Sequence, residues 1–318
     1  MTFDGWWTRR DFMKQAGVFS TALLLGGCES CRDRIANRPT RRNIANLAAN
    51  DPVIQAFKDG VQAMKNLPGS DPRSWTAQAQ IHFDHCPHGN WWFLPWHRGY
   101  LLYFEAIIRK LSGYDDFALP YWNWTTTPSV PSHFWGSGNP LLNTTRWIGP
   151  ADTADPSWVG ATVIGDILDL TNFLTFASGQ ASTKREPSTQ GMLEATPHNN
   201  IHGFVGGDMG AYHSPLDPVF WCHHNMCDCL WYDWNVNRGN ANTDQQPWYD
   251  LHFTEFVDQD GNAVDITAGI TVLYPVFTYQ FEPCGPVQIE SRFRERAALE
   301  AFLKKGAPVR LEFGERVE

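Results

Sequence analysis

The stretch HFDHCPHGNWWFLPWHR (residues 82–98) decides the fold, because it carries four histidines into a segment rich in aromatic side chains. A second histidine group lies far along the chain, in HNNIH (198–202) and DPVFWCHHNMCDCLW (217–231). Each group leads into apolar residues at helical spacing, which predicts buried helices. Histidines carried by facing helices indicate metal sites inside a helical bundle.

His198 and His202 stand four residues apart, so both imidazoles project from one helix face and reach a single ion. A third imidazole from a neighbouring helix would complete a neutral site. Imidazole binds copper, zinc, iron and nickel, so the spacing does not name the metal. A zinc peptidase motif requires glutamate directly after its first histidine, and Asn199 there disfavours that class.

Several segments resemble the tyrosinase, catechol oxidase and haemocyanin superfamily of type 3 dicopper proteins. The resemblance extends from about Arg41 to Phe281. It rests on RNI (42–44), FLPWHR (93–98), LPYWNW (119–124), HN (198–199) and the segment 217–231. The resemblance implies two copper ions, with dioxygen as co-substrate.

The resemblance also implies six copper ligands, with His82, His88 and His97 on copper A and His198, His202 and His224 on copper B. His224 is preferred to His223 because Asp228 follows it by four residues, as in the family pattern. His85 replaces His88 if the loop between them folds differently. The spelling Cys86-Pro87-His88 favours His88, because the family often has Cys-X-His at this point.

In relatives with that spelling, a thioether bond joins the cysteine sulfur to the histidine ring. The resemblance therefore implies a Cys86–His88 cross-link, which would restrain His88 and remove a thiol able to reduce copper(II). The alternative is a free buried cysteine. The remaining cysteines of the copper B segment are predicted to be buried, unreactive packing residues: Cys222, Cys227 and Cys229.

The activity implied by the resemblance is oxidation of monophenols and o-diphenols to o-quinones. Glu194 and Asn199 are expected to hold a water that deprotonates monophenols, since a buried carboxylate with a raised pKa is a plausible general base. The alternative for Glu194 is a helix N-terminal capping carboxylate. Two other functions stay open: an o-diphenol or o-aminophenol oxidase without hydroxylation, and a haemocyanin-like oxygen carrier.

Three further residues are expected to support the ligands. Phe93 and Phe220 each precede a presumed ligand by four residues, so each can pack beside an imidazole, although core packing explains them equally well. Asp228 is expected either to orient an imidazole through its free N–H or to bind an arginine near the N-terminus.

The N-terminal sequence TRRDFMK (8–14), followed by a short apolar stretch (16–27), matches a twin-arginine export signal. Residues 1–27 are predicted to direct export to a periplasmic, secreted or lipid-anchored location, and a helper protein is a possible source of copper. LGGC (25–28) resembles a lipoprotein cleavage box ending at Cys28. The alternative is a disulfide between Cys28 and Cys31.

Composition fits one large catalytic domain, predicted over residues 28–282. The chain has 318 residues, 42% of them hydrophobic, and 15 tryptophans that supply large core side chains. The formal charge of −9 argues against nucleic acid as a partner, whereas the small phenolic substrates implied by the resemblance need no basic patch. The tail (283–318) is expected to pack on the core, too short to shield the copper pocket.

Helical spacing and turn residues predict helices near 51–66, 94–112, 196–206, 216–234 and 289–305, with short strands at 271–281 and 308–313. Between 125 and 190, only 158–176 is predicted to be ordered, and the rest to form loops that frame the pocket. The predicted fold is therefore mainly α: a four-helix bundle holding a dicopper centre, with long irregular loops and a few short β-strands.

Overall fold

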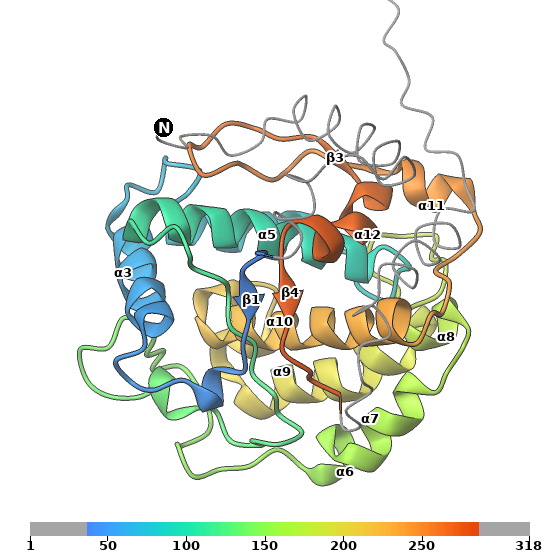
Figure 1. The fold of residues 1–318 in the computed structure, drawn as a ribbon, viewed down its shortest axis with the longest axis horizontal. Helices are drawn as coiled ribbons and strands as arrows, with labels where there is room; N and C mark the ends of the chain where they lie inside the picture. The colour runs from blue at the N-terminus through green and yellow to red at the C-terminus, as the bar shows by residue number, and fades with distance from the viewer. Residues whose placement is uncertain (1–36, 286–318) are drawn as a thin grey trace, which may run out of the picture.

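The computed structural model describes residues 37–285, and those residues form a mainly helical fold with four very short strands (Figure 1). The export signal, Cys28, Cys31, the helix predicted at 289–305 and the strand predicted at 308–313 lie outside the described residues, so these stay predictions. No helix within residues 37–285 combines the length and the apolar character that crossing a membrane requires.

The long helix α5 (Phe93–Ser112) organises the fold. It packs against α3 (Pro52–Asn66), α10 (Val219–Tyr232) and α12 (Ala268–Phe277), and in Figure 1 it runs across the molecule above α10. The two remaining helices that carry histidines are α4 (Trp75–His85) and α9 (Asn199–Val205). Helices α4, α5, α9 and α10 therefore form the predicted bundle.

Local sequence explains why α3 starts and packs where it does. Asp51 caps the helix by accepting a hydrogen bond from the Val53 N–H, and Pro52 occupies the first turn, where no donor is lost. The apolar residues of α3 recur at helical spacing and are buried. Gly60 allows close packing on α5, since a Cβ there would lie 2.8 Å from the Ile108 side chain.

One predicted element differs from the structure, and one helix of the structure was not predicted. The segment 271–281 was expected to be a strand, but most of it belongs to α12, and only Gln280–Phe281 forms the strand β4. An apolar run of this length does not distinguish a strand from a buried helix, and here Thr267 caps a helix by accepting from the Ile270 N–H. Helix α4 was not predicted as a separate element; Ser74 caps it.

The strands are short and join distant parts of the chain. Strand β1 (Thr40–Arg41) pairs in parallel with β4, and β2 (His252–Phe253) pairs antiparallel with β3 (Ile266–Thr267). The predicted ordered stretch at 158–176 consists of three short helices: α6 (Pro156–Val159), α7 (Ala161–Leu168) and α8 (Phe173–Phe176). Connections without regular structure fill most of the remaining residues between 125 and 190.

Cys229 was predicted to be a buried, unreactive packing residue, and this prediction is wrong. Cys229 forms a disulfide with Cys284, which ties α10 to the segment after β4. The two residues are 55 positions apart, so sequence spacing gave no sign of the pairing. Cys222 and Cys227 are free and buried, as expected.

A buried network of ion pairs links β1, α5 and α10. Arg41 contacts Glu105 at 2.9 Å and Asp228 at 3.1 Å, and Asp228 also binds Arg98 at 2.5 Å. Arg109 provides a second cation to Glu105. Burial alone would raise the pKa of Glu105, but the two guanidinium groups hold it below its ordinary value. Asp228 therefore binds arginines, one of the two alternatives predicted for it.

We expect Glu105→Gln to lower the free energy of unfolding by about 3–5 kcal/mol, because it leaves two buried guanidinium groups short of negative charge. Urea unfolding of the protein measures this loss. Lys110→Met is the matched control on the same helix, since it breaks an exposed pair with Asp260 and should cost at most about 1 kcal/mol. Equal small losses in both variants would contradict the structural importance of the buried network.

Candidate metal centre

Seven histidines from six segments meet inside the bundle. Helix α4 supplies His82, the following loop supplies His88 and α5 supplies His97; the π-helical turn η4 (Glu194–His198), α9 and α10 supply His198, His202, His223 and His224. The two sequence groups face each other: the rings of His97 and His224 stack at 4.3 Å, and those of His88 and His198 lie 5.6 Å apart.

Peptide carbonyl groups decide which nitrogen of three imidazoles carries the proton. The Nδ1 atoms of His82, His97 and His202 each lie 2.7 Å from a backbone oxygen, belonging to Tyr212, Phe93 and Met209 respectively. A carbonyl oxygen only accepts, so each Nδ1 must donate a proton. In the neutral rings the Nε2 atoms are therefore left with free lone pairs.

These lone pairs converge. The Nε2 atoms of His82 and His97 lie 3.3 Å apart although neither carries a proton, so their lone pairs repel unless a cation lies nearby. The Nε2 atom of His198 is buried and has no hydrogen-bond partner within the described chain. Such unpaired buried acceptors fit a metal ion.

Burial keeps these imidazoles neutral and ready to bind a metal. It lowers the pKa of His97 to about 3 and that of His202 to about 4. Burial, followed by repulsion from neighbouring imidazoles, also holds the pKa of His82, His88 and His198 well below the ordinary value.

His223 and His224 differ in the proton each carries. The indole N–H of Trp124 donates to Nδ1 of His223 at 3.0 Å, so the proton of the neutral His223 ring must be on Nε2. His223 therefore has no free lone pair for a metal. Nε2 of His224 lies 3.1 Å from Nε2 of His202, within the group of acceptors. Trp124 belongs to the LPYWNW segment, but its contact with His223 was not foreseen.

The loop after α4 places His88, and not His85, against the other imidazoles. His85 is exposed at the end of α4, whereas His88 forms a possible ligand group with His82 and Cys86. Cys86 is buried, and burial raises the pKa of its thiol to about 12.

Arg185, which was not singled out in the sequence, fastens this loop. Its guanidinium group contacts Sγ of Cys86 at 3.3 Å and donates to the Cys86 carbonyl at 3.2 Å. The same group lies 3.7 Å from the ring centre of Tyr212, a cation–π contact.

Aromatic side chains surround the imidazoles, as predicted for two of them. Phe93 lies 4.8 Å from the rings of both His97 and His198, and Phe220 lies 4.2 Å from the ring of His224. On the outer side, the ring of Tyr212 is 40% exposed and 5.6 Å from that of His88.

Glu194 is fully buried and links η4 to the loop that carries His88. Its carboxylate accepts the Gly89 N–H at 2.7 and 2.9 Å and a hydrogen bond from the Ser178 hydroxyl. Burial raises the pKa of Glu194 to about 7, against the opposing effect of these hydrogen bonds. Gly89 has a φ of 56°, and a Cβ there would lie 1.9 Å from the Glu186 carbonyl oxygen. Glycine is therefore required at this position.

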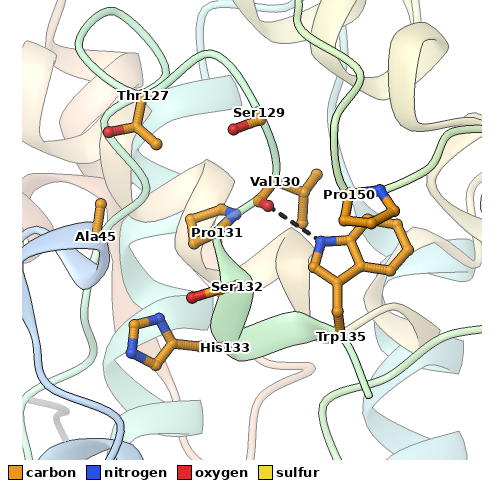
Figure 2. Close-up of a pocket in the computed structure, with 9 residues that line it drawn as sticks. All are labelled: Ala45, Thr127, Ser129, Val130, Pro131, Ser132, His133, Trp135 and Pro150. Atoms are coloured by element: carbon orange, nitrogen blue, oxygen red, sulfur yellow. Dashed lines mark hydrogen bonds between the residues drawn. The ribbon is translucent and has the colours of Figure 1, made fainter. Parts of the chain in front are cut away.

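A separate cavity of about 300 Å³ lies among the loops at 127–135 and Pro150 (Figure 2). Its lining includes hydroxyl groups, prolines, His133 and Trp135, but none of the seven clustered histidines. His133 uses Nε2 to donate to the Leu47 carbonyl at 3.0 Å, and the Trp135 N–H donates to Val130 at 3.1 Å. This cavity is not part of the metal centre.

The metal-free protein should lose stability as the pH falls below about 6.5. Unfolded histidines take up protons near that pH, whereas the buried rings have lowered pKa values and stay neutral; the unfolded state then binds more protons. Each deeply buried histidine should cost roughly 1.4 kcal/mol per pH unit below this point. Thermal unfolding from pH 8 to pH 5 measures the effect. A melting temperature that is constant across this range would contradict the neutral, buried cluster.

The helical bundle and its facing groups of neutral imidazoles define a dinuclear metalloprotein. The chain matches the model for the common central domain of tyrosinase over residues 61–161 and 138–237. A latent chloroplastic polyphenol oxidase of Prunus armeniaca is 31% identical over 278 residues, covering 72% of this chain and 46% of that protein. A tyrosinase of Hahella sp. (strain CCB-MM4) is 28% identical over 303 residues, covering 78% and 64% respectively.

Solved structures share the fold. An active aurone synthase (polyphenol oxidase) superposes with a TM-score of 0.68 at 25% identity, covering 77% of this chain and 86% of that one. The Grenache polyphenol oxidase of Vitis vinifera gives a TM-score of 0.68 at 24% identity, covering 78% and 86%. The chain belongs to the tyrosinase family of type 3 dicopper proteins. Two copper ions are the metals of this family, and the clustered imidazoles of the chain fit them. The chain spans less than two thirds of the length of the two relatives above.

Proposed function

We propose that the protein is a copper-dependent phenol oxidase that uses O2 to oxidise monophenols and o-diphenols to o-quinones. The observation that carries the proposal is the convergence of unprotonated Nε2 atoms, fixed by peptide carbonyls, among buried aromatic side chains. When bound, the two copper ions would supply the redox chemistry: they would bind O2 and accept electrons from the phenol.

The proposed ligands are His82, His88 and His97 for copper A and His198, His202 and His224 for copper B. Four of these rings donate from Nδ1 to an oxygen, which leaves Nε2 to face the metal. His223 is excluded because its Nδ1 accepts the Trp124 N–H.

The chain's own residues bind the phenol and manage its proton. Phe93 and Phe220 flank the imidazoles and offer apolar faces to an aromatic ring. In this proposal Glu194 accepts the proton of an incoming monophenol through one intervening water, since its carboxyl is buried and has a pKa of about 7. Asn199 orients His198, whose Nδ1 lies 2.9 Å from its side-chain oxygen.

One observation favours an o-diphenol or o-aminophenol oxidase that does not hydroxylate monophenols. Glu194 is fully buried and already accepts hydrogen bonds from Gly89 and Ser178, which weakens it as a base. Nothing in the site favours the oxygen-carrier alternative.

Absorption spectroscopy separates these functions. Copper-loaded protein treated with hydrogen peroxide should develop a strong near-ultraviolet band, and both tyrosine and catechol should discharge it with formation of a quinone. Discharge by catechol alone would assign a diphenol oxidase. A band that neither compound discharges would assign an oxygen carrier. Failure to form the band would reject the dicopper phenol oxidase.

We expect Glu194→Gln to lower monophenol oxidation by roughly 10²- to 10⁴-fold, the usual contribution of a general base, with a much smaller effect on diphenol oxidation. Steady-state rates with tyrosine and with catechol, both at saturating copper, provide the comparison. Because the carboxylate form is the base, monophenol oxidation should also rise with pH through about 7 in the unchanged protein. Equal loss with both substrates would remove Glu194 from the proton transfer.

We also propose a thioether between Cys86 and His88. Cys86 is buried next to this histidine, and no disulfide partner competes for its sulfur within the described residues. The peptide that carries both residues should be lighter by the mass of two hydrogens once the protein is loaded with copper in the presence of O2, which accepts the two electrons and two protons that are lost; mass spectrometry would show the difference. Recovery of the unmodified peptide from fully loaded protein would rule out the cross-link.

A further inference from the structure

Gln190 lies between the two residues that the sequence singled out for proton transfer. Its amide nitrogen donates to Glu194 at 3.3 Å, and its amide oxygen accepts from the Asn199 amide nitrogen at 3.0 Å. The Asn199 side-chain oxygen in turn lies 2.9 Å from Nδ1 of His198. Four side chains thus form one continuous chain of hydrogen bonds from a carboxylate to a histidine.

This chain has a fixed direction. Above about pH 7 Glu194 is ionised and its carboxylate only accepts, so Gln190 must turn its NH2 group to Glu194 and its oxygen to Asn199. Asn199 must then donate to Gln190 and turn its own oxygen to His198. That oxygen can only accept, so His198 must carry its proton on Nδ1. The Nε2 atom of His198, which is buried and has no hydrogen-bond partner among the described residues, therefore carries the free lone pair.

His198 needs this support more than its neighbours do. His82, His97 and His202 donate from Nδ1 to peptide carbonyls, which cannot reverse their role. The partner of His198 is a side-chain amide, and an amide that rotates by half a turn offers a donor in place of an acceptor. Within the described residues, the Asn199 amide nitrogen donates to Gln190, and this hydrogen bond opposes the rotation.

The backbone holds Gln190 in place. It forms an antiparallel β-bridge with Ser178, which also bonds to Glu194. The adjacent Gly191 passes so close to Ala177 that a Cβ would lie 2.4 Å from the Ala177 carbonyl oxygen. The two side-chain donors to Glu194, Ser178 and Gln190, are therefore set by one local backbone arrangement.

We propose that Gln190 is a positioning residue for copper B. Gln190 donates to Glu194 and accepts from Asn199, so the Asn199 side-chain oxygen faces His198. The proton of His198 is thereby fixed on Nδ1, and its Nε2 lone pair faces the metal. This rests on the proposed assignment of His198 as a ligand. Glu194 then acts on copper binding as well as on the proton of the substrate.

The test is copper retention by the full-length, copper-loaded chain during titration with a chelator. Gln190→Met keeps the length of the side chain but removes both hydrogen bonds. One of the two coppers should leave at a chelator concentration roughly tenfold lower than in the unchanged protein, the loss typical for residues that orient metal ligands. Gln180→Met, in an exposed residue of the same loop, is the control and should retain both coppers normally.

Nitrogen-15 NMR of the metal-free, full-length chain provides a second readout, which a purely structural role would not move. His198 should be in the Nδ1–H form in the unchanged protein and a mixture of both forms in Gln190→Met. In addition, combining Gln190→Met with Asn199→Ala should weaken copper retention no further than Asn199→Ala alone, because both changes break one chain.

Unchanged copper retention and an unchanged His198 tautomer in Gln190→Met would overturn the proposal. So would equal loss of both coppers together with a lower melting temperature, because that pattern indicates general unfolding. Since these measurements contain no phenol, they can fail while phenol oxidation stands, and phenol oxidation can fail while they succeed.

Discussion

Hydrogen bonds from histidine Nδ1 atoms to acceptor oxygens decide which nitrogen of each ring can bind a metal, and the rest of the structure must hold those oxygens in place. An imidazole binds a metal through whichever nitrogen lacks the proton, and the carbonyls of Tyr212, Phe93 and Met209 make that nitrogen Nε2 in three rings. The carbonyls must therefore be placed as accurately as the histidines. Phe93 belongs to the same helix as His97, Met209 lies in the 3-10 helix η5 (Gly207–Gly210) that follows α9, and Tyr212 lies in the turn after η5.

The cost of this arrangement is a core that contains many polar groups. Seven neutral imidazoles that lack part of their hydrogen bonding are enclosed by aromatic side chains, and metal binding offsets the desolvation of their lone pairs. The ion-pair network of Arg41, Glu105 and Asp228 joins β1, α5 and α10 beside this cluster. This network holds the two central helices, α5 and α10, together.

The sequence predicted those parts of the structure that depend on helical periodicity and on short sequence motifs. Helices α3 and α5 follow clear helical spacing, and the fold class and the two-copper centre agree with family membership. The predicted strand at 271–281 was wrong because an apolar run fits a buried helix equally well. Contacts such as Trp124 with His223 and Cys229 with Cys284 join residues 99 and 55 positions apart, and no local pattern reveals them.

Anomalous X-ray diffraction at the copper edge, on crystals of the copper-loaded protein, tests the central claim most directly. The account predicts two peaks roughly 3.5–4 Å apart. One should be bound by Nε2 of His82 and His97 together with His88, and the other by Nε2 of His198, His202 and His224. A single peak, or a copper bound by His223 or His85, would contradict the assignment of lone pairs from which the function was inferred.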